Sequence, residues 1–354
     1  MHKNATTPTN LSLLGSFLVL TAASFAQSAD PAADAPIVLD PVTVEGTQGA
    51  SYNVKRAMIA TKTDTALIDT PQSVTILTKE FLDDTAVTSI GDAARYIPGV
   101  GTAQGEGNRD TVVLRGNSST GDYFVDGLRD DTQYYRDFYN IERLEALKGP
   151  SGMIFGRGGP GGVLNRVTKQ AVIGGQSFYE VSALAGSWDQ YRSTIDFNQS
   201  LTDVSSLRLT GLYEDSDSFR DGVFIKRQGV NPSIGWALSK QTTLRAGFEY
   251  FNDERVADRG IPSFNGRPFK TDESTFFGDP TRSPTHTYVR AFTASLDHVF
   301  DSGATLRNAT RYASYDKFYQ NVYANGAVTP GSTVAIAAYN QSTDRENLLN
   351  QTDL

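Results

Sequence analysis

Arginine and aromatic side chains are interspersed within one short polar stretch of this sequence. The stretch reads Arg129-Asp-Asp-Thr-Gln-Tyr134-Tyr135-Arg136-Asp-Phe138. Guanidinium groups pair with anionic oxygens and stack on aromatic rings, so the stretch is suited to a flat, anionic ligand. The interspersed aspartates offset part of the positive field. We expect Arg129, Arg136 and the three aromatic residues to contact such a ligand, with solvated loop residues as the alternative.

Two further segments offer the same side-chain chemistry. The glycine-rich loop from Gln104 to Arg109 places Arg109 near the first stretch in sequence. A long connection between two strand-like segments, Asp253 to Thr287, supplies more arginine and phenylalanine. The expected contacts from this connection are Arg255, Arg259, Phe264, Phe276 and Phe277.

Composition excludes several other kinds of site. The chain has no cysteine, which excludes disulfides and cysteine-ligated zinc. His2, His286 and His298 are scattered, so no histidine metal cluster is expected, and no cofactor or directly bound metal is predicted. A net charge of −8 argues against general nucleic-acid binding.

One glycine motif resembles a dinucleotide-binding fingerprint. Gly156-Arg-Gly158-Gly-Pro-Gly161 satisfies G-x-G-x-x-G, and Glu180 follows about twenty residues later. Such a site needs a strand before the motif and a helix after it. The sequence instead predicts a helix over 140–147 before the motif and an alternating strand around Glu180. We therefore expect these glycines to serve tight turns.

The N-terminal 49 residues divide into an export signal and a flexible linker. Residues 1–26 have a weakly positive start, an apolar run from Leu11 to Ala23, and a small-x-small site ending at Ala26. Cleavage after Ala29 is the alternative. Residues 27–49 are rich in Ala, Asp and Pro and are expected to be flexible. Within them, the segment from Leu39 to Val44 alternates Val42 and Val44 with Thr43, which suits addition to an exposed sheet edge.

Residues 50–170 mix helix and strand signals. Strands are predicted over 70–77, 111–116 and 123–127. A helix is predicted over 88–97, capped by Thr88 or Ser89 and stopped by Pro98-Gly99. A second helix is predicted over 140–147, because Ile141, Leu144 and Leu147 would share one face. The segment is expected to be a compact α+β domain.

Strands with period two follow one another from about residue 177. Leu207, Leu209 and Tyr213 alternate with Arg208 and other polar residues, and similar patterns recur around residues 179–185, 244–250 and 292–300. Short turns and long loops alternate, which is typical of an outer-membrane β-barrel, although a soluble β-sandwich also alternates. About seven strands are predicted, with an eighth from near Thr343. A plugged transporter barrel has about 22 strands, so an incomplete barrel, in an N-terminal piece of a chain about twice as long, is expected.

Five segments occur in an order that resembles the TonB-dependent siderophore receptors. They are Thr70-Pro-Gln-Ser-Val, Ala93-Ala-Arg-Tyr-Ile-Pro-Gly-Val100, Leu114-Arg-Gly116, Tyr123-Phe-Val-Asp-Gly127, and the stretch from Asn140 through Lys148-Gly-Pro to Asn165. The resemblance implies an α+β plug domain, residues 50–170, followed by the first strands of an antiparallel transmembrane β-barrel, residues 177–354.

Function follows from the same resemblance. It implies an outer-membrane receptor of a Gram-negative cell, not an enzyme, that binds a ferric siderophore and imports it with energy from the inner-membrane TonB complex. Iron would enter only as part of the siderophore, and the other partners would be TonB and outer-membrane lipid, without nucleic acid. The implied TonB box is Asp40, Pro41, Val42, Thr43 and Val44. Arg115 and Lys148 match plug positions that pair with barrel-wall carboxylates.

Three questions stay open from the sequence. A catecholate chelate is strongly anionic, whereas a hydroxamate chelate carries less charge and would depend more on Tyr134, Tyr135 and Phe138. A binding-only β protein, such as an adhesin or a phage or bacteriocin receptor, is the alternative function. Uptake of cobalamin or a glycan by the same fold would differ only in the ligand.

Overall fold

The computed structural model describes residues 52, 54–55, 62, 66–118, 122–156 and 161–354. The predicted signal peptide, the linker and the expected TonB box at Asp40–Val44 lie outside the described residues.

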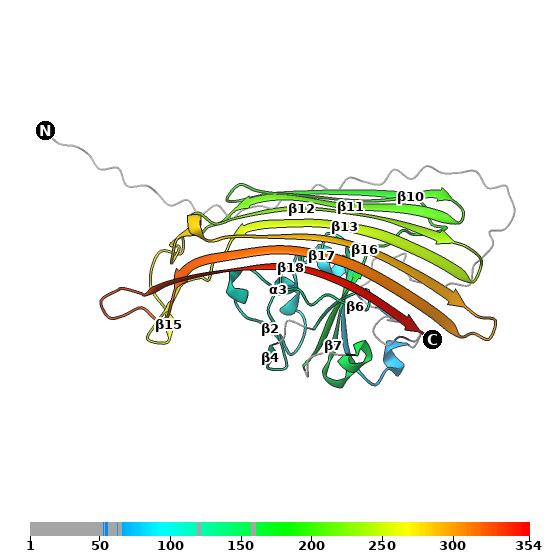
Figure 1. Ribbon diagram of the computed structural model, residues 1–354, viewed down its shortest axis with the longest axis horizontal. Helices are drawn as coiled ribbons and strands as arrows, with labels where there is room; N and C mark the ends of the chain where they lie inside the picture. The colour runs from blue at the N-terminus through cyan, green and yellow to red at the C-terminus, as the bar shows by residue number, and fades with distance from the viewer. Residues whose placement is uncertain (1–51, 53, 56–61, 63–65, 119–121, 157–160) are drawn as a thin grey trace.

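Eight long antiparallel strands form one curved sheet, here called the outer sheet (Figure 1). Their order is β18-β17-β16-β13-β12-β11-β10-β9, so neighbours in space follow the order of the chain. The bounds are β9 Phe178–Gly186, β10 Gln190–Thr202, β11 Ser205–Asp217, β12 Phe224–Ala237, β13 Thr242–Val256, β16 Pro284–Val299, β17 Thr305–Ala324 and β18 Ile336–Asp353. The single curved sheet fits part of a barrel and not a sandwich of two sheets.

A smaller α+β unit, here called the inner domain, packs against the concave side of the outer sheet (Figure 1). A five-stranded sheet of order β1-β7-β8-β5-β6 forms its centre, and β2-β3-β4 forms a second sheet. Its strands are β1 Ser73–Thr78, β2 Val100–Thr102, β3 Val112–Leu114, β4 Asn117–Ser118, β5 Tyr123–Val125, β6 Leu128–Arg129, β7 Ile141–Lys148 and β8 Gly162–Thr168. Its helices are α2 Lys79–Asp84 and α3 Ile90–Ala94, with 3-10 turns η1 Leu67–Asp69, η2 Gly105–Gly107 and η3 Gly149–Phe155.

The predicted helix over 140–147 is wrong, because the same residues form strand β7. β7 pairs with β1 on one side and β8 on the other, so its backbone groups are satisfied by neighbours distant in sequence. Ile141, Leu144 and Leu147 are buried as expected, but Glu145 and Ala146 between them are fully buried too. In β7 the large apolar residues Ile141, Leu144 and Leu147 recur every third residue, a spacing that imitates one face of a helix although the segment is a strand.

The helix predicted over 88–97 is confirmed as the shorter α3. Ser89 is the N-cap: its Oγ accepts a hydrogen bond from the Asp92 N–H at 3.2 Å and donates to the Asp92 carboxylate at 2.7 Å. Ile90 is fully buried in the core of the inner domain. Helix α2 was not predicted, although Thr78 caps it by accepting from the Phe81 N–H.

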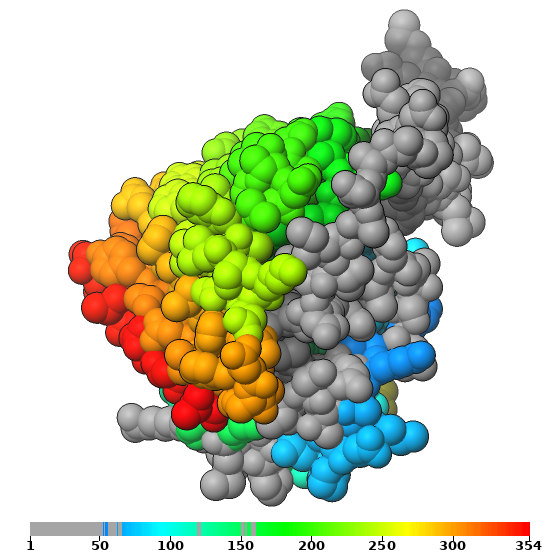
Figure 2. All heavy atoms as spheres, turned by 90° about the vertical axis from the view of Figure 1, so that its right-hand side faces the viewer, coloured from blue at the N-terminus to red at the C-terminus, as the bar shows by residue number. Residues whose placement is uncertain are grey.

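Alternation in the outer sheet separates two environments, as the sequence predicts. Leu207 and Tyr213 are exposed on the convex side, whereas Arg208, Thr210 and Glu214 of the same strand are buried on the concave side. Figure 2 shows the green to red atoms of this sheet along one side of the molecule and blue and cyan atoms of the inner domain beside them. The concave side is therefore polar and is largely covered by the inner domain.

Strand bounds and connections differ in detail from the prediction. Strand β18 begins at Ile336, earlier than the expected Thr343. β13 continues to Val256, so the long connection is shorter than predicted and spans residues 257–283, here called the outer loop. It contains a small hairpin, β14 Ser263–Phe264 and β15 Arg267–Pro268, and a 3-10 turn η4 Pro280–Arg282.

The dinucleotide alternative fails on local structure. The last glycine of the motif, Gly161, is followed directly by strand β8 and not by a helix. Gly161 also lies so close to Leu114 that an added Cβ would stand 2.3 Å from the Leu114 carbonyl oxygen. A close backbone approach inside the inner domain explains this glycine.

None of the helices in the described ranges has both the length and the apolar character needed to cross a membrane.

Candidate ligand-binding site

The loop from Gln104 to Arg109, here called the apex loop, meets the outer loop where the inner domain reaches the loop end of the outer sheet. Gly107 has a φ of +70°, and a Cβ there would lie 2.5 Å from the Asp258 carbonyl oxygen. The Gln104 side-chain amide donates to the Arg259 carbonyl oxygen. Two segments far apart in sequence are thus in direct backbone contact, which only glycine permits at this distance.

Two of the predicted arginines converge on one carboxylate in the apex loop. Arg109 and Arg259 both form ion pairs with Glu106, the latter at 3.4 Å. The Arg259 side chain is 17% exposed. It stacks over Tyr323 with 3.7 Å between the guanidinium carbon and the ring centroid, and it donates to the Tyr319 hydroxyl at 2.8 Å.

Two more of the expected ligand contacts, Arg255 and Tyr135, lie against each other. The Arg255 guanidinium is 3.9 Å from the ring centroid of Tyr135, and Arg255 is paired with Asp253. Arg255 was expected in a loop, but it belongs to strand β13 and is buried. Tyr135 is half-buried. Two residues that were each expected to contact the ligand thus contact each other, and Arg255 belongs to the wall and not to a loop.

Arg136 occupies a different position from that expected of a ligand-facing arginine. Its side chain is fully buried, and Nε donates to Asp130 at 3.0 Å. Nη1 and Nη2 donate to backbone carbonyl oxygens of residues 130, 132 and 134. A second ion pair joins it to Asp110 at 3.6 Å. All three guanidinium nitrogens therefore already have partners inside the protein.

The buried Asp130 carboxylate holds this region together. Besides Arg136, it accepts from Arg166 at 2.6 Å and from the hydroxyls of Tyr134 and Tyr315. Burial opposes ionisation of Asp130, but the two guanidinium groups hold its pKa well below the usual value. Tyr134 is likewise buried and packs against Phe251 and Tyr315, so it positions the loop and is not open to solvent.

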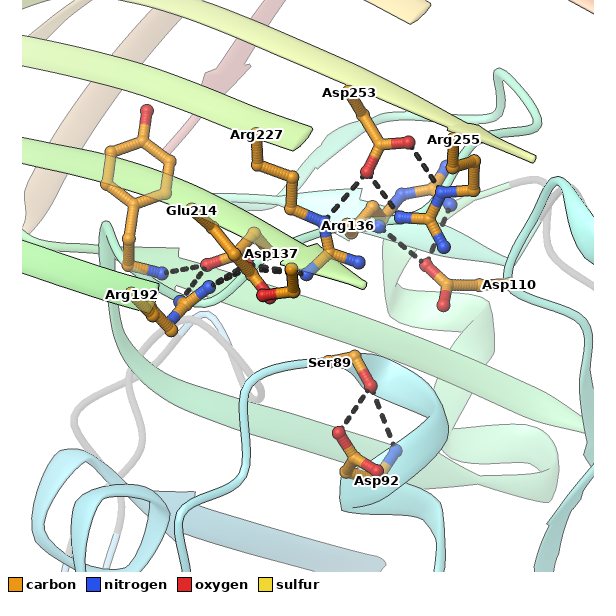
Figure 3. A network of polar contacts seen from close by, with 12 residues as sticks. Ser89, Asp92, Asp110, Arg136, Asp137, Arg192, Glu214, Arg227, Asp253 and Arg255 are labelled. Carbon is orange, nitrogen blue, oxygen red and sulfur yellow. Dashed lines mark hydrogen bonds and ion pairs between the residues drawn. The ribbon is translucent and has the colours of Figure 1, made fainter. Parts of the chain in front are cut away.

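Asp137 connects the inner domain to two strands of the outer sheet (Figure 3). Its carboxylate accepts from Arg192 of β10 at 2.7 and 2.9 Å and from Arg227 of β12 at 3.0 Å. Glu214 of β11 pairs with both arginines, and Asp253 of β13 pairs with Arg227. These five residues are named here the anchor network. The arginines hold the pKa of Asp137 below its usual value although burial would raise it.

Other predicted residues lie away from the apex loop. Phe138 is buried in the core of the inner domain. Arg129 is half-buried, with its guanidinium 5.5 Å from the Phe124 ring centroid. Phe264 and Phe277 belong to an aromatic cluster within the outer loop that is centred on Phe269.

Three further predicted residues lie in other parts of the structure. Phe276 is half-buried in the outer loop. Arg115 is exposed and Lys148 is buried. The Lys148 ammonium donates to Thr75 and, at 3.4 Å, to the Pro98 carbonyl oxygen, both within the inner domain. Pairing of Arg115 and Lys148 with barrel carboxylates stays a prediction.

Four site residues were missed by the sequence reasoning. Lys317 of β17 donates to the Asn108 side chain at 2.6 Å, while Tyr319, Tyr323 and Tyr339 surround Arg259. A signal existed in the tyrosine-rich, alternating run of β17 and in the start of β18. The run alone did not say which end of the strand faces the apex loop.

The comparisons with known proteins agree with this arrangement. Residues 66–163 match the TonB-dependent Receptor Plug Domain. Over 80% of this chain, the sequence is 34% identical to the probable TonB-dependent receptor BfrD of Bordetella pertussis, covering 39% of that protein. Over 72%, it is 30% identical to the probable TonB-dependent siderophore receptor PiuA of Acinetobacter baumannii, covering 35% of it.

A solved structure shares the fold. The ferric-catecholate import receptor Fiu from Escherichia coli K12, in its open form, superposes with a TM-score of 0.74 at 27% identity, over 82% of this chain and 47% of Fiu. The chain thus spans less than half the length of each protein it is compared with here. The inner domain is the plug, the outer sheet is part of the barrel wall, and the chain belongs to the TonB-dependent receptors.

Proposed function

We propose that this protein binds a ferric siderophore beside the apex loop and imports it by TonB-coupled active transport. As a TonB-dependent receptor it resides in the outer membrane of a Gram-negative cell. The observation that carries the proposal is the convergence of Arg109, Arg255, Arg259 and Lys317 where apex loop, outer loop and barrel wall meet. No enzymatic step is part of the proposal.

Charge and aromatic rings support a ferric chelate as the ligand. A ferric tris-catecholate is a trianion with flat faces, and guanidinium groups suit both its oxygens and its rings. Tyr135, Tyr319, Tyr323 and Tyr339 supply aromatic surface next to these cations. The names of two relatives, a probable siderophore receptor and a ferric-catecholate import receptor, are consistent with this class.

The predicted ligand set changes in the proposal. Arg109, Arg255, Arg259 and Tyr135 stay in it, joined by Lys317 and the three tyrosines. Arg136, Tyr134 and Phe138 become supporting residues, because every guanidinium nitrogen of Arg136 has an internal partner and the two aromatic side chains pack in hydrophobic cores. Arg129 and the three loop phenylalanines, Phe264, Phe276 and Phe277, are proposed as peripheral contacts at most.

Energy coupling is proposed to act through Asp40–Val44, ahead of a plug spanning residues 50–170 and a barrel segment from residue 177. Strand addition to a TonB partner uses backbone hydrogen bonds, and proline lacks the donor. In the full-length receptor, Val42→Pro should retain binding of a radiolabelled ferric tris-catecholate at the cell surface but abolish its uptake. Val42→Ala, which keeps the N–H, is the matched control and should transport normally.

The same assay separates the alternatives. Binding without any uptake by the wild-type receptor, in cells with an active TonB complex, would favour a binding-only protein and contradict the transport proposal. A receptor that binds no ferric chelate but binds cobalamin or a glycan tightly would have that compound as its ligand in place of a siderophore. If Val42→Pro still imports the chelate, the energy-coupling segment must lie elsewhere in the chain.

A further inference from the structure

Arg259 joins the apex loop, the outer loop and two barrel strands. It belongs to the outer loop, pairs with Glu106 of the apex loop, and contacts Tyr319 and Tyr323 of β17 and Tyr339 of β18. Its contact with Glu106 is long, 3.4 Å, and Glu106 has a second, closer partner in Arg109. Glu106 would therefore stay charge-paired if Arg259 moved away.

One N–H donor of the Arg259 guanidinium is not used in a hydrogen bond within the described residues. This donor is Nε, which is buried. The side chain borders an open cavity of about 330 Å³ lined also by Gln104, Pro262, Tyr323 and Asn325. A buried, unpaired donor is costly, so the site gains when an anionic acceptor enters the cavity.

The outer loop presents Arg259 from a fixed backbone. The Ala257 N–H donates to the Ser283 carbonyl oxygen at 2.8 Å, which closes the base of the loop. The Val328 N–H donates to the Ser263 carbonyl oxygen at 2.8 Å, which ties the hairpin to the next connection. The movable part is therefore the Arg259 side chain and not the loop as a whole.

We propose that Arg259 sets the charge class of the ligand by exchanging partners, from the Glu106 carboxylate to the catecholate oxygens of a trianionic chelate in this cavity. The exchange removes the ion pair between outer loop and apex loop, so occupation of the cavity loosens the apex loop. Stacking on Tyr323 keeps the guanidinium at the cavity in both states. This inference rests on the proposed function and adds to it the selective residue and its signal.

The first test measures binding to the full-length receptor with two chelates of iron, a trianionic tris-catecholate and a neutral tris-hydroxamate. Arg259→Gln should weaken binding of the trianion by about 10- to 100-fold, the range for loss of one charge-assisted interaction. Any binding of the neutral chelate should stay unchanged. Arg282→Gln is the control, because Arg282 lies in the same loop, is 76% exposed and pairs only with Asp279 among the ion pairs of the described residues.

The second test distinguishes partner exchange from a structural role. Glu106→Gln removes the competing carboxylate, so the trianion should bind several-fold more tightly. A purely structural pair predicts weaker binding of both chelates in both variants, and that result would overturn the proposal. A wild-type receptor that prefers the neutral chelate would also overturn it.

Failure of the function and failure of the inference give different results. If the wild-type receptor binds neither chelate, the proposed function fails. If it binds the trianion and Arg259→Gln binds it equally well, only the role of Arg259 is refuted. Hydrogen exchange of the apex loop, measured with and without the trianion, should show faster exchange on binding; unchanged or slower exchange would refute the loosening step.

Discussion

Replacing Asp137 by asparagine should detach the plug segment around it from the barrel wall. The Asp137 side chain is fully buried and accepts three hydrogen bonds from Arg192 and Arg227, with a fourth from the Tyr139 N–H. Asparagine removes the charge and turns an NH₂ group toward guanidinium donors. Two buried cations then lose their shared counter-charge.

The size of the destabilisation depends on the ion pairs that remain after the substitution. Removing one partner of a buried ion pair costs about 3–5 kcal/mol. Arg192 keeps Glu214 at 2.6 Å and Arg227 keeps Asp253 at 2.8 Å, so the lower end applies. A cost of about 3 kcal/mol in the free energy of local opening corresponds to about a 100-fold larger open population.

Hydrogen exchange of the full-length receptor measures this opening. Amides of residues 130–140 should exchange about 100-fold faster in Asp137→Asn, while barrel strands away from the anchor network keep their protection. Asp215→Asn is the matched control, because Asp215 pairs with Lys226 across β11 and β12 at 3.2 Å but both side chains are well exposed. Asp215→Asn should change the free energy of local opening by no more than about 1 kcal/mol.

Equal exchange rates in the two variants would refute the reasoning, because the anchor network would then contribute no more than a surface pair. A double-mutant cycle of Asp137→Asn with Arg192→Gln checks the cause. The two changes should be less than additive, since either one already breaks the same contact. Additive effects would mean that Asp137 acts through other partners.

Two further predictions concern the plug. The pKa of Asp137 is lower in the folded state than in the unfolded state, so the Asp137 ion pairs stabilise the fold fully above the unfolded pKa of about 4. This stabilisation is lost as pH falls through the lower folded pKa. After correction for intrinsic rates, hydrogen exchange at residues 130–140 should therefore be constant between about pH 5 and 7 and become faster only below about pH 4. Gly107→Ala should separate the apex loop from the outer loop, because the added Cβ would lie 2.5 Å from the Asp258 backbone and the φ of residue 107 is +70°. The expected result is faster proteolysis within residues 257–283. Gly101→Ala is the control, because a Cβ at Gly101 has no heavy atom within 4 Å.

Local sequence patterns predicted much of the fold. Period-two alternation predicted the strands of the wall and the face on which Arg208 and Glu214 lie, because neighbouring residues of a strand point to opposite sides whatever the strand packs against. Ser89 and the Pro98-Gly99 stop predicted α3 for an equally local reason, since a cap bonds to backbone groups within one turn. The order of the five plug segments identified the family.

Tertiary structure decided the rest, because burial and pairing depend on segments distant in sequence. Residues 140–147 became a strand only because β1 and β8 supply partners on both sides. Arg136 and Arg259 both belong to polar segments that also contain aromatic residues, and we expected both to contact the ligand. Arg136 is enclosed by carbonyl groups and Asp130, whereas Arg259 keeps an unpaired nitrogen beside a cavity. The sequence determined which residues have the chemistry to bind an anion, and only the packing of plug against wall determined which of them are free to do so.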